Sequence, residues 1–323
     1  MRKTSCNERD TEVTAFMVNV RTILCPVDFF PASDAAVSYA AGLAANYKAT
    51  IRLLHVITPI AAGAYEYAID TAEIVASMEE SSMAEMSKLI AGMKESGVVA
   101  EPEVRIGDVY DEIKRDIELV KPDLIVMGTH GRRGVQRWFM GSTTEKLLRH
   151  IPVPLVTMSA AREQPWTESR FKRILVTTDF SDGTADALAY AFSVAQENES
   201  EVVLLHVLDD VSMDSVGKYR DLLIDGVRKQ LEDLVPPEAG NWYDIVTRVE
   251  KGVPYRMILK TIKDERPDLL VMNIHGKGML DRALLGSTAE RVVRAASCPV
   301  MMVPSMKCRL NRRARPAGNC VAA

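Results

Sequence analysis

The chain has 323 residues, of which 47% are hydrophobic and 26% are charged, and its formal net charge is -4. These values are ordinary for a globular protein, and the length suits two domains of about 150 residues each. The small negative net charge excludes an overall positive electrostatic potential that would attract nucleic acid. No apolar run reaches the length that spans a membrane. We therefore expect neither a nucleic acid nor a membrane as a partner.

Residues 1–20 contain no apolar signal-peptide core, and we predict a weakly ordered segment there. The chain has five cysteines, an odd number, and they show no metal-ligand spacing. Free thiols of this kind favour a reducing compartment, so we expect a cytoplasmic protein.

Residues 21–158, the first copy of an internal repeat, alternate between short apolar runs and longer amphipathic segments. The predicted strands are 22–28, 50–57, 100–106, 123–128 and 153–158, and the predicted helices are 33–47, 71–96, 108–120 and 142–149. The apolar runs are continuous, which indicates strands buried on both faces, as in a parallel sheet. This alternation requires right-handed crossovers and an open, doubly wound sheet.

A polar linker over residues 159–170 separates this part from residues 171–305, the second copy. Its predicted strands are 173–179, 201–208, 244–250, 268–273 and 300–304. The tail that follows, residues 306–323, is basic and contains no acidic residue, and we expect it to be solvated.

The two copies repeat each other in sequence. Residues 21–29 (RTILCPVDF) return as 172–180 (KRILVTTDF), and residues 122–127 (PDLIVM) return as 267–272 (PDLLVM). The offset is 151 residues early and 145 later, so one region of the second copy is shorter by six residues. A period this long indicates a duplicated domain. We predict an α/β protein with two doubly wound, five-stranded parallel-sheet domains.

One segment of the first copy has the features of a phosphate-binding site. Residues 128–143 follow a predicted strand and open a predicted helix, with Gly128, Gly131 and Gly141 preceding Ser142 and Thr143. The first two glycines would let the backbone approach a ligand or adopt a positive φ, and the helix start would offer N–H groups to phosphate. In the alternative interpretation, the glycines only form a turn and Ser142 only caps the helix. The chain contains no Gly-x4-Gly-Lys-Ser/Thr, which excludes a P-loop NTPase.

The spacing Gly-x2-Gly-x9-Gly-Ser resembles the nucleotide motif of the universal stress protein family, in a tandem form that covers nearly all of residues 20–305. The resemblance implies adenine nucleotide alpha hydrolase-like domains with strand order 3-2-1-4-5 that bind ATP or a related adenine nucleotide. By the family pattern, the ligand residues of the first copy are Pro26, Val27 and Asp28 at the adenosine, Val56 and Met127 at the base, and Gly128, Gly131, Gly141, Ser142 and Thr143 at the ribose and phosphates.

Asp28 ends the first predicted strand. A carboxylate there is costly unless it is hydrogen-bonded, and a ligand amine or hydroxyl could supply that bond. The alternative is that Asp28 caps the following helix, a role that Ser33 could equally take. Of the two roles for Asp28, we favour contact with the ligand over capping of the helix.

The second copy carries the equivalent positions Asp179, Val207, Gly276, Gly286, Ser287 and Thr288. Asn273 replaces the first glycine of the motif. Asparagine tolerates left-handed backbone, but its side chain fills space that a ribose would need. Thr177 and Thr178 also replace the Pro-Val pair of the first copy. We therefore expect the nucleotide mainly in the first copy and weaker binding in the second.

The histidines do not indicate a metal centre. His55 and His206 lie in apolar strands, where a hydrogen-bonded structural histidine is expected, and for His130 and His275 a loop hydrogen bond is at least as well supported as a phosphate contact. No zinc-ligand spacing is present. A Mg²⁺ ion bound with the nucleotide phosphates would need few protein ligands.

The final strand of each copy would be an edge open to pairing. In the family such strands mediate dimer formation, so the resemblance implies that residues 152–158 pair with residues 299–303 within the chain. It also leaves room for a further homodimer.

Beyond the phosphate-binding loop we find no general base, nucleophile or oxyanion arrangement. We interpret the chain as a stress-response regulator or sensor that binds ATP or a related adenine nucleotide, with at most slow ATP hydrolysis. The alternatives are a scaffold whose pockets bind no nucleotide and an enzyme of related architecture, which would need a further catalytic constellation.

Overall fold

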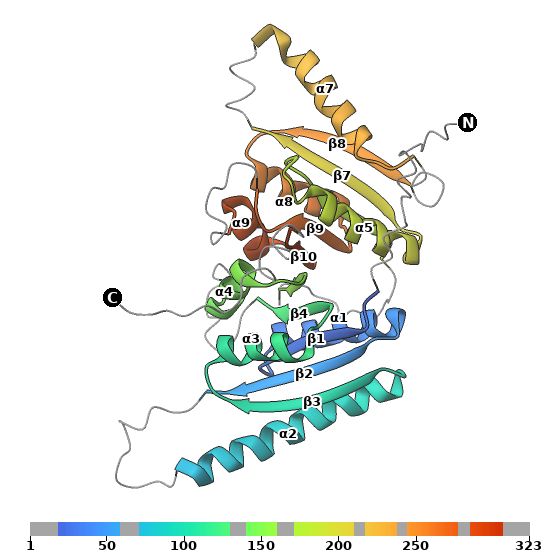
Figure 1. Cartoon of the computed structure of the whole chain (residues 1–323). Coiled ribbons are helices and arrows are strands. Elements are labelled where there is room, and N and C mark those ends of the chain that lie inside the picture. The colour runs from blue at the N-terminus through green and yellow to red at the C-terminus, as the bar shows by residue number, and fades with distance from the viewer. Residues whose placement is uncertain are drawn as a thin grey trace, which may run out of the picture.

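A computed structural model describes residues 19–58, 71–129, 140–159, 171–209, 217–237, 244–276 and 285–305. The first copy contains strands β1 (Thr22–Val27), β2 (Thr50–Ile57), β3 (Val99–Ile106), β4 (Leu124–Gly128) and β5 (Leu155–Met158), and helices α1 (Pro31–Tyr47), α2 (Thr71–Glu95), α3 (Val109–Val120) and α4 (Ser142–His150). The predicted alternation of strands and helices is confirmed (Figure 1). The predictions for residues 1–18, for 160–170 of the linker and for the tail lie outside the described residues.

The second copy repeats this arrangement. It contains strands β6 (Arg173–Thr177), β7 (Glu201–Leu208), β8 (Ile245–Lys251), β9 (Leu269–Asn273) and β10 (Val300–Val303), and helices α5 (Thr184–Asn198), α7 (Arg220–Asp233), α8 (Pro254–Glu265) and α9 (Ser287–Ala295), with a short 3-10 turn, η2 (Gly217–Tyr219), before α7. Helix α5 begins two positions later in the repeat than α1 does.

All ten strands form one sheet in the order β3-β2-β1-β4-β5-β10-β9-β6-β7-β8. Each copy therefore has the predicted order 3-2-1-4-5, and the strands within a copy are parallel. Strands β5 and β10 join the copies in antiparallel orientation. Figure 1 shows the sheet continuing from one copy into the other across this junction. The predicted fold class and the predicted pairing of the final strands are confirmed.

The junction has pseudo-two-fold symmetry centred on Val156 and Met301. These two residues pair with each other and occupy equivalent positions in the repeat. Thr157 pairs with Val300 on one side, where its Oγ1 donates to the Val300 carbonyl oxygen at 3.3 Å. A two-fold axis of this kind brings the same surface of each copy together and reverses the strand direction, which explains the antiparallel pairing.

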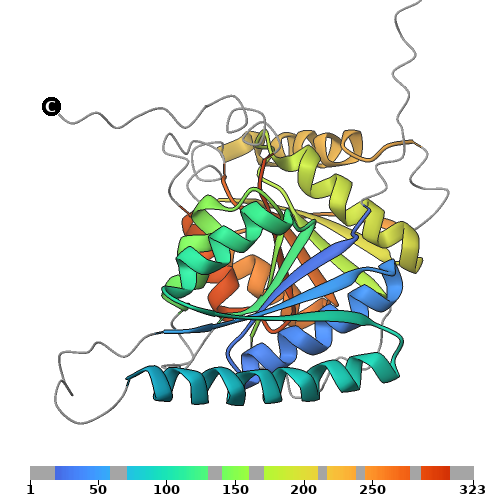
Figure 2. The ribbon, with the colours of Figure 1, turned by 60° about the horizontal axis from the view of Figure 1, so that its bottom comes forward.

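The central strands are apolar because both faces of the sheet are buried there. In β4, the first four residues are buried, as the continuous apolar run predicts. Helices cover the two faces of the sheet, with α1 and α2 on one side of the first copy and α3 and α4 on the other (Figure 2).

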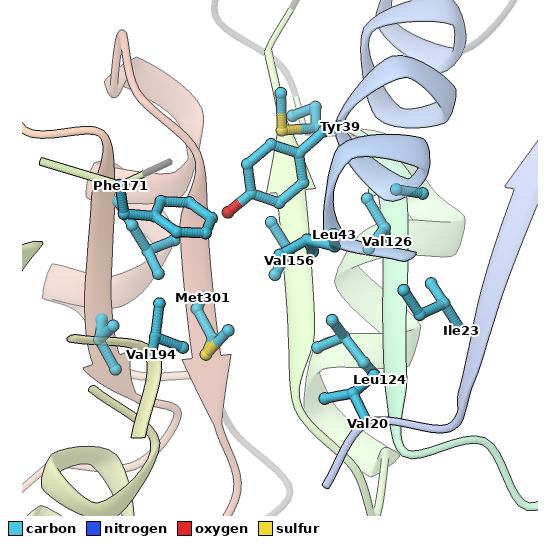
Figure 3. Close-up of a cluster of buried hydrophobic side chains, with 14 of the residues drawn as sticks. Val20, Ile23, Tyr39, Leu43, Leu124, Val126, Val156, Phe171, Val194 and Met301 are labelled. Carbon is cyan, nitrogen blue, oxygen red and sulfur yellow. The ribbon is translucent and has the colours of Figure 1, made fainter. Parts of the chain in front are cut away.

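The apolar core on each face continues through both copies. On the face covered by α1 and α5, a cluster joins Tyr39, Val156, Phe171, Val194 and Met301 (Figure 3). The rings of Tyr39 and Phe171 meet edge to face with their centroids 5.9 Å apart. The two copies therefore form one continuous hydrophobic structure. Within the described residues, no helix has the length and apolarity needed to cross a membrane.

Candidate functional site

A cavity of about 1210 Å³ opens at the carboxyl ends of β1, β2 and β4 in the first copy. The ligand residues predicted for this copy line it wherever the structure describes them; these are Pro26, Val27, Asp28, Val56, Met127, Gly128, Gly141, Ser142 and Thr143. Gly131 lies outside the described residues. The fold thus brings together residues from three separate strand ends and one helix start, at the edge where open parallel sheets bind ligands.

The start of α4 forms one wall of this cavity. Gly141 is the N-cap of α4 and, having no side chain, makes no capping hydrogen bond to the N–H groups of the first turn. The Gly141 N–H donates to the Thr129 carbonyl oxygen at 2.8 Å, which ties the loop to the end of β4. Ser142 is the first residue of α4, so the interpretation of Ser142 as the cap is wrong. N–H groups without a capping side chain, together with the helix dipole, attract an anion.

Gly128 allows a close approach between two elements. A Cβ atom there would lie 2.9 Å from the carbonyl carbon and 3.0 Å from the Cβ of Ala32, at the start of α1. Its φ is not positive, so of the two roles expected for this glycine, close approach of the backbone or positive φ, the structure does not show the second. The absence of a side chain lets β4 pack against α1 beside the cavity.

The Asp28 carboxylate is held at the cavity wall by its own turn. Its Oδ1 accepts from the Phe30 N–H at 3.1 Å, and the Asp28 N–H donates to Ser33 Oγ at 3.1 Å. Phe30 is the N-cap of α1, which has no side-chain capping bond, so the capping alternatives for Asp28 and Ser33 are wrong. Asp28 instead closes an Asx turn between β1 and α1.

Helix α2 supplies a polar wall that sequence reasoning missed. Ser77, Ser81, Ser82 and Glu85 line the cavity together with Met78. Their spacing places them on one face of the helix. The spacing is visible in the sequence, but a sequence does not show that this face turns toward the site.

The charged side chains among the described residues of the lining are acidic. They are Asp28, Glu85 and Asp108. Asp108 is the N-cap of α3, and its carboxylate accepts from the N–H groups of Tyr110 and Asp111 at 2.9 and 3.2 Å. Because a carboxylate already occupies the start of α3, the start of α4 is the better place for an anionic group.

In the second copy, the equivalent aspartate lies beside a glycine of the motif. Asp179 Oδ1 accepts from the Ser181 N–H at 3.0 Å, and its Oδ2 lies 2.8 Å from the place that a Cβ on Gly276 would take. Glycine at this position therefore leaves room for the carboxylate. Gly286 is the N-cap of α9, without a capping side chain, and Ser287 and Thr288 follow it in the helix. Val207 lies in β7.

Asn273 does not use the tolerance of asparagine for left-handed backbone, because its φ is not positive. The side chain packs against Gly183 at the start of α5, and its Nδ2 donates to Ser181 Oγ at 3.4 Å. Its Oδ1 is buried, with no hydrogen-bond partner in the described part of the chain.

The histidines within the strands are structural, as predicted. The Nδ1 atoms of His55 and His206 lie 2.8 Å from the carbonyl oxygens of Val27 and Thr178, respectively. His130 lies outside the described residues. Across the described ranges, no group of three or more His, Cys, Asp or Glu side chains is arranged to hold a metal ion.

Comparison with known proteins agrees with this architecture. A model of the universal stress protein family matches residues 19–158 and again residues 170–304. A universal stress protein from Mycolicibacterium smegmatis is 29% identical over 294 residues, covering 87% of this chain and 96% of that protein. Another, from Methanocaldococcus jannaschii, is 35% identical over 152 residues, covering 43% of this chain and 86% of that protein. The crystal structure of a universal stress protein from Archaeoglobus fulgidus has the same fold, with a TM-score of 0.65 at 23% identity over 88% of this chain and 98% of that one. The repeated fold and the two family matches together show that the chain belongs to the universal stress protein family, in its tandem two-domain form.

Proposed function

We propose that the first copy binds an adenine nucleotide, with ATP as the leading candidate, and that the protein acts as a nucleotide-dependent regulator or sensor in the stress response. One observation carries the proposal. The cavity of the first copy combines the Asp28 carboxylate, the close-packed Gly128 and the uncapped start of α4 at a single place. Its volume of about 1210 Å³ is ample for a nucleotide.

Each wall would make a different contact. The N–H groups at the start of α4 and the hydroxyls of Ser142 and Thr143 would hold phosphate oxygens. Asp28 would accept a hydrogen bond from an amine or hydroxyl of the adenosine, and Val56 and Met127 would give the base an apolar surface. A Mg²⁺ ion would be held chiefly by the phosphates, since it needs few protein ligands.

A binding role fits these residues better than rapid catalysis does. The N–H groups and hydroxyls of the cavity would position phosphate, and any hydrolysis would proceed slowly from that positioning alone. The cysteine pattern supports a cytoplasmic location. The second candidate function is a scaffold of the same fold, favoured by the altered position Asn273 in the second copy.

The test is direct. The purified protein is denatured and the released small molecules are separated by chromatography, and emptied protein is then titrated with ATP, ADP and AMP. We expect a released adenine nucleotide and saturable binding. A protein that releases none and binds none of the three would overturn the proposal in favour of the scaffold.

A further inference from the structure

Each copy holds a phenylalanine in left-handed backbone at the edge of its site. Phe29 has a φ of 61° and Phe180 has a φ of 58°. A bulky L-residue avoids this region because its Cβ lies too close to the carbonyl oxygen. Unfavourable backbone of this kind persists only where the surroundings enforce it, and it gathers at functional sites. The same outlier occurs at the same place in both copies, although the residue that follows it differs, Phe30 in the first copy and Ser181 in the second.

A histidine ring contacts the phenylalanine ring in both copies. The rings of Phe29 and His55 have centroids 4.6 Å apart with planes inclined by 38°, and those of Phe180 and His206 have centroids 4.6 Å apart with planes inclined by 40°. Each histidine is in turn anchored through its Nδ1, 2.8 Å from a strand carbonyl oxygen. A carbonyl oxygen can only accept, so Nδ1 carries the proton in this contact. The histidine is thus a fixed surface on which the phenyl ring rests.

The phenylalanine is also the central residue of the turn that orients the site carboxylate. Asp28 Oδ1 accepts from the Phe30 N–H at 3.1 Å, and this bond spans Phe29. In the second copy, Asp179 Oδ1 accepts from the Ser181 N–H at 3.0 Å, and this bond spans Phe180. The backbone angles of the phenylalanine therefore set the direction of the carboxylate. That direction places Asp28 in the cavity lining and Asp179 against Gly276.

We propose that Phe29 and His55 are positioning residues that hold the Asp28 carboxylate in place for the nucleotide, and that Phe180 and His206 do the same for Asp179. The identity of the ligand, an adenine nucleotide, rests on the proposed function. A carboxylate that is already fixed before binding loses less conformational entropy when the ligand binds. More of the free energy of the contact therefore contributes to the affinity. The unfavourable backbone at Phe29 is compensated by its contact with the histidine ring.

Amide hydrogen exchange measured by NMR tests the positioning without any ligand. Phe29→Gly removes the ring but leaves a residue that adopts positive φ freely, so the fold is retained. We expect the Phe30 N–H to exchange about tenfold faster or more, as a local opening, while the Ser181 N–H is unaffected. Phe180→Gly should produce the converse. His55→Leu, which removes the Nδ1 donor at similar side-chain volume, should also expose the Phe30 N–H. Unchanged exchange at Phe30 in both first-copy variants would overturn the proposal.

Titration with ATP tests the link to the ligand through a double-mutant cycle. Phe29→Gly should weaken binding about tenfold in the native protein and have little further effect in an Asp28→Ala background, because the two residues act through one contact. Equal weakening in both backgrounds would contradict the positioning role. If the native protein binds no adenine nucleotide, the proposed function fails, and the exchange measurements still decide whether Phe29 and His55 hold the carboxylate.

Discussion

The side chain of Asn273 packs on Gly183, with its Cγ 3.1 Å from the place that a Cβ on Gly183 would take. At the same two places in the first copy stand Gly128 and Ala32, and there a Cβ on Gly128 would lie 2.9 Å from the Ala32 carbonyl carbon. In the first copy the strand carries the glycine and the helix carries the larger residue, whereas in the second copy the strand carries the larger residue and the glycine precedes the helix. Asn273 is accommodated because the N-cap of α5 is a glycine, Gly183, in a helix that begins two positions later in the repeat than α1 does.

This exchange predicts a coupled pair. Gly183→Ala should lower the free energy of unfolding by about 1 kcal/mol, since Asn273 must move to make room. The loss should be smaller in an Asn273→Gly background, and the two changes should therefore be non-additive in denaturant unfolding. Gly226→Ala is the matched control. No atom lies within 4 Å of a Cβ at that helical position, and a stabilisation of about 1 kcal/mol is expected there. A stabilisation by Gly183→Ala of the same size would contradict the packing argument.

The start of α4 allows binding to be separated from folding. Ser142→Asp places a carboxylate in the first turn of α4, where the helix dipole favours it by about 0.3 to 1 kcal/mol. The same carboxylate would repel a phosphate, and we expect ATP affinity to fall about 100-fold. Thermal unfolding and calorimetric titration measure the two effects separately.

Ser287→Asp is the equivalent change at the start of α9. We expect the same small gain in helix stability and a smaller loss of total nucleotide binding, because the second copy carries Asn273 in place of the first glycine. Equal losses from the two variants would show that both copies bind nucleotide equally.

A buried ion cluster stabilises the edge of the first copy. The Asp116 carboxylate is fully buried and lies against the guanidinium groups of Arg52 and Arg105. Asp116→Ala should cost about 3 kcal/mol of unfolding free energy, because it leaves two arginines without their buried counter-charge. The equivalent residue of the second copy is Thr261, which donates to the Met257 carbonyl oxygen at 2.9 Å. Thr261→Ala should cost about 1 kcal/mol, and a loss equal to that of Asp116→Ala in denaturant unfolding would argue against the cluster.

The thiol of Cys25, one residue before Pro26 of the cavity lining, should be chemically unreactive in the folded protein. Cys25 lies fully buried in β1, and burial raises the pKa of its thiol to about 12 from an ordinary value of 9.0. Only the thiolate is nucleophilic, so iodoacetamide at about pH 8.5 should leave Cys25 unmodified in the native protein and alkylate it after unfolding. Peptide mass spectrometry measures the difference. Because the folded protein holds this proton more tightly than the unfolded chain, the contribution of Cys25 to stability falls as pH rises from 9.0 toward about 12.

Much of the fold could be predicted from the sequence. The continuous apolar runs of β1 and β4 identified strands buried on both faces, and the repeat identified two equivalent domains. The spacing of Gly128, Gly141 and Ser142 identified the strand end and the helix start that line the cavity. These features are local, because the spacing of apolar residues predicts which strands are buried, and glycines at particular positions predict turns.

The remaining features depend on which distant residues approach one another, and only the tertiary structure decided them. Gly128 is required by Ala32, Asn273 is accommodated by Gly183, and α2 turns its serines toward the site; none of these relationships follows from the periodicity of a single segment. Phe29 reads as an ordinary apolar residue until its φ and its contact with His55 are known. Sequence patterns determine which faces are buried. Distances of about 3 Å between packed elements determine which substitutions those faces accept, and such distances arise only once the helices are seated on the sheet.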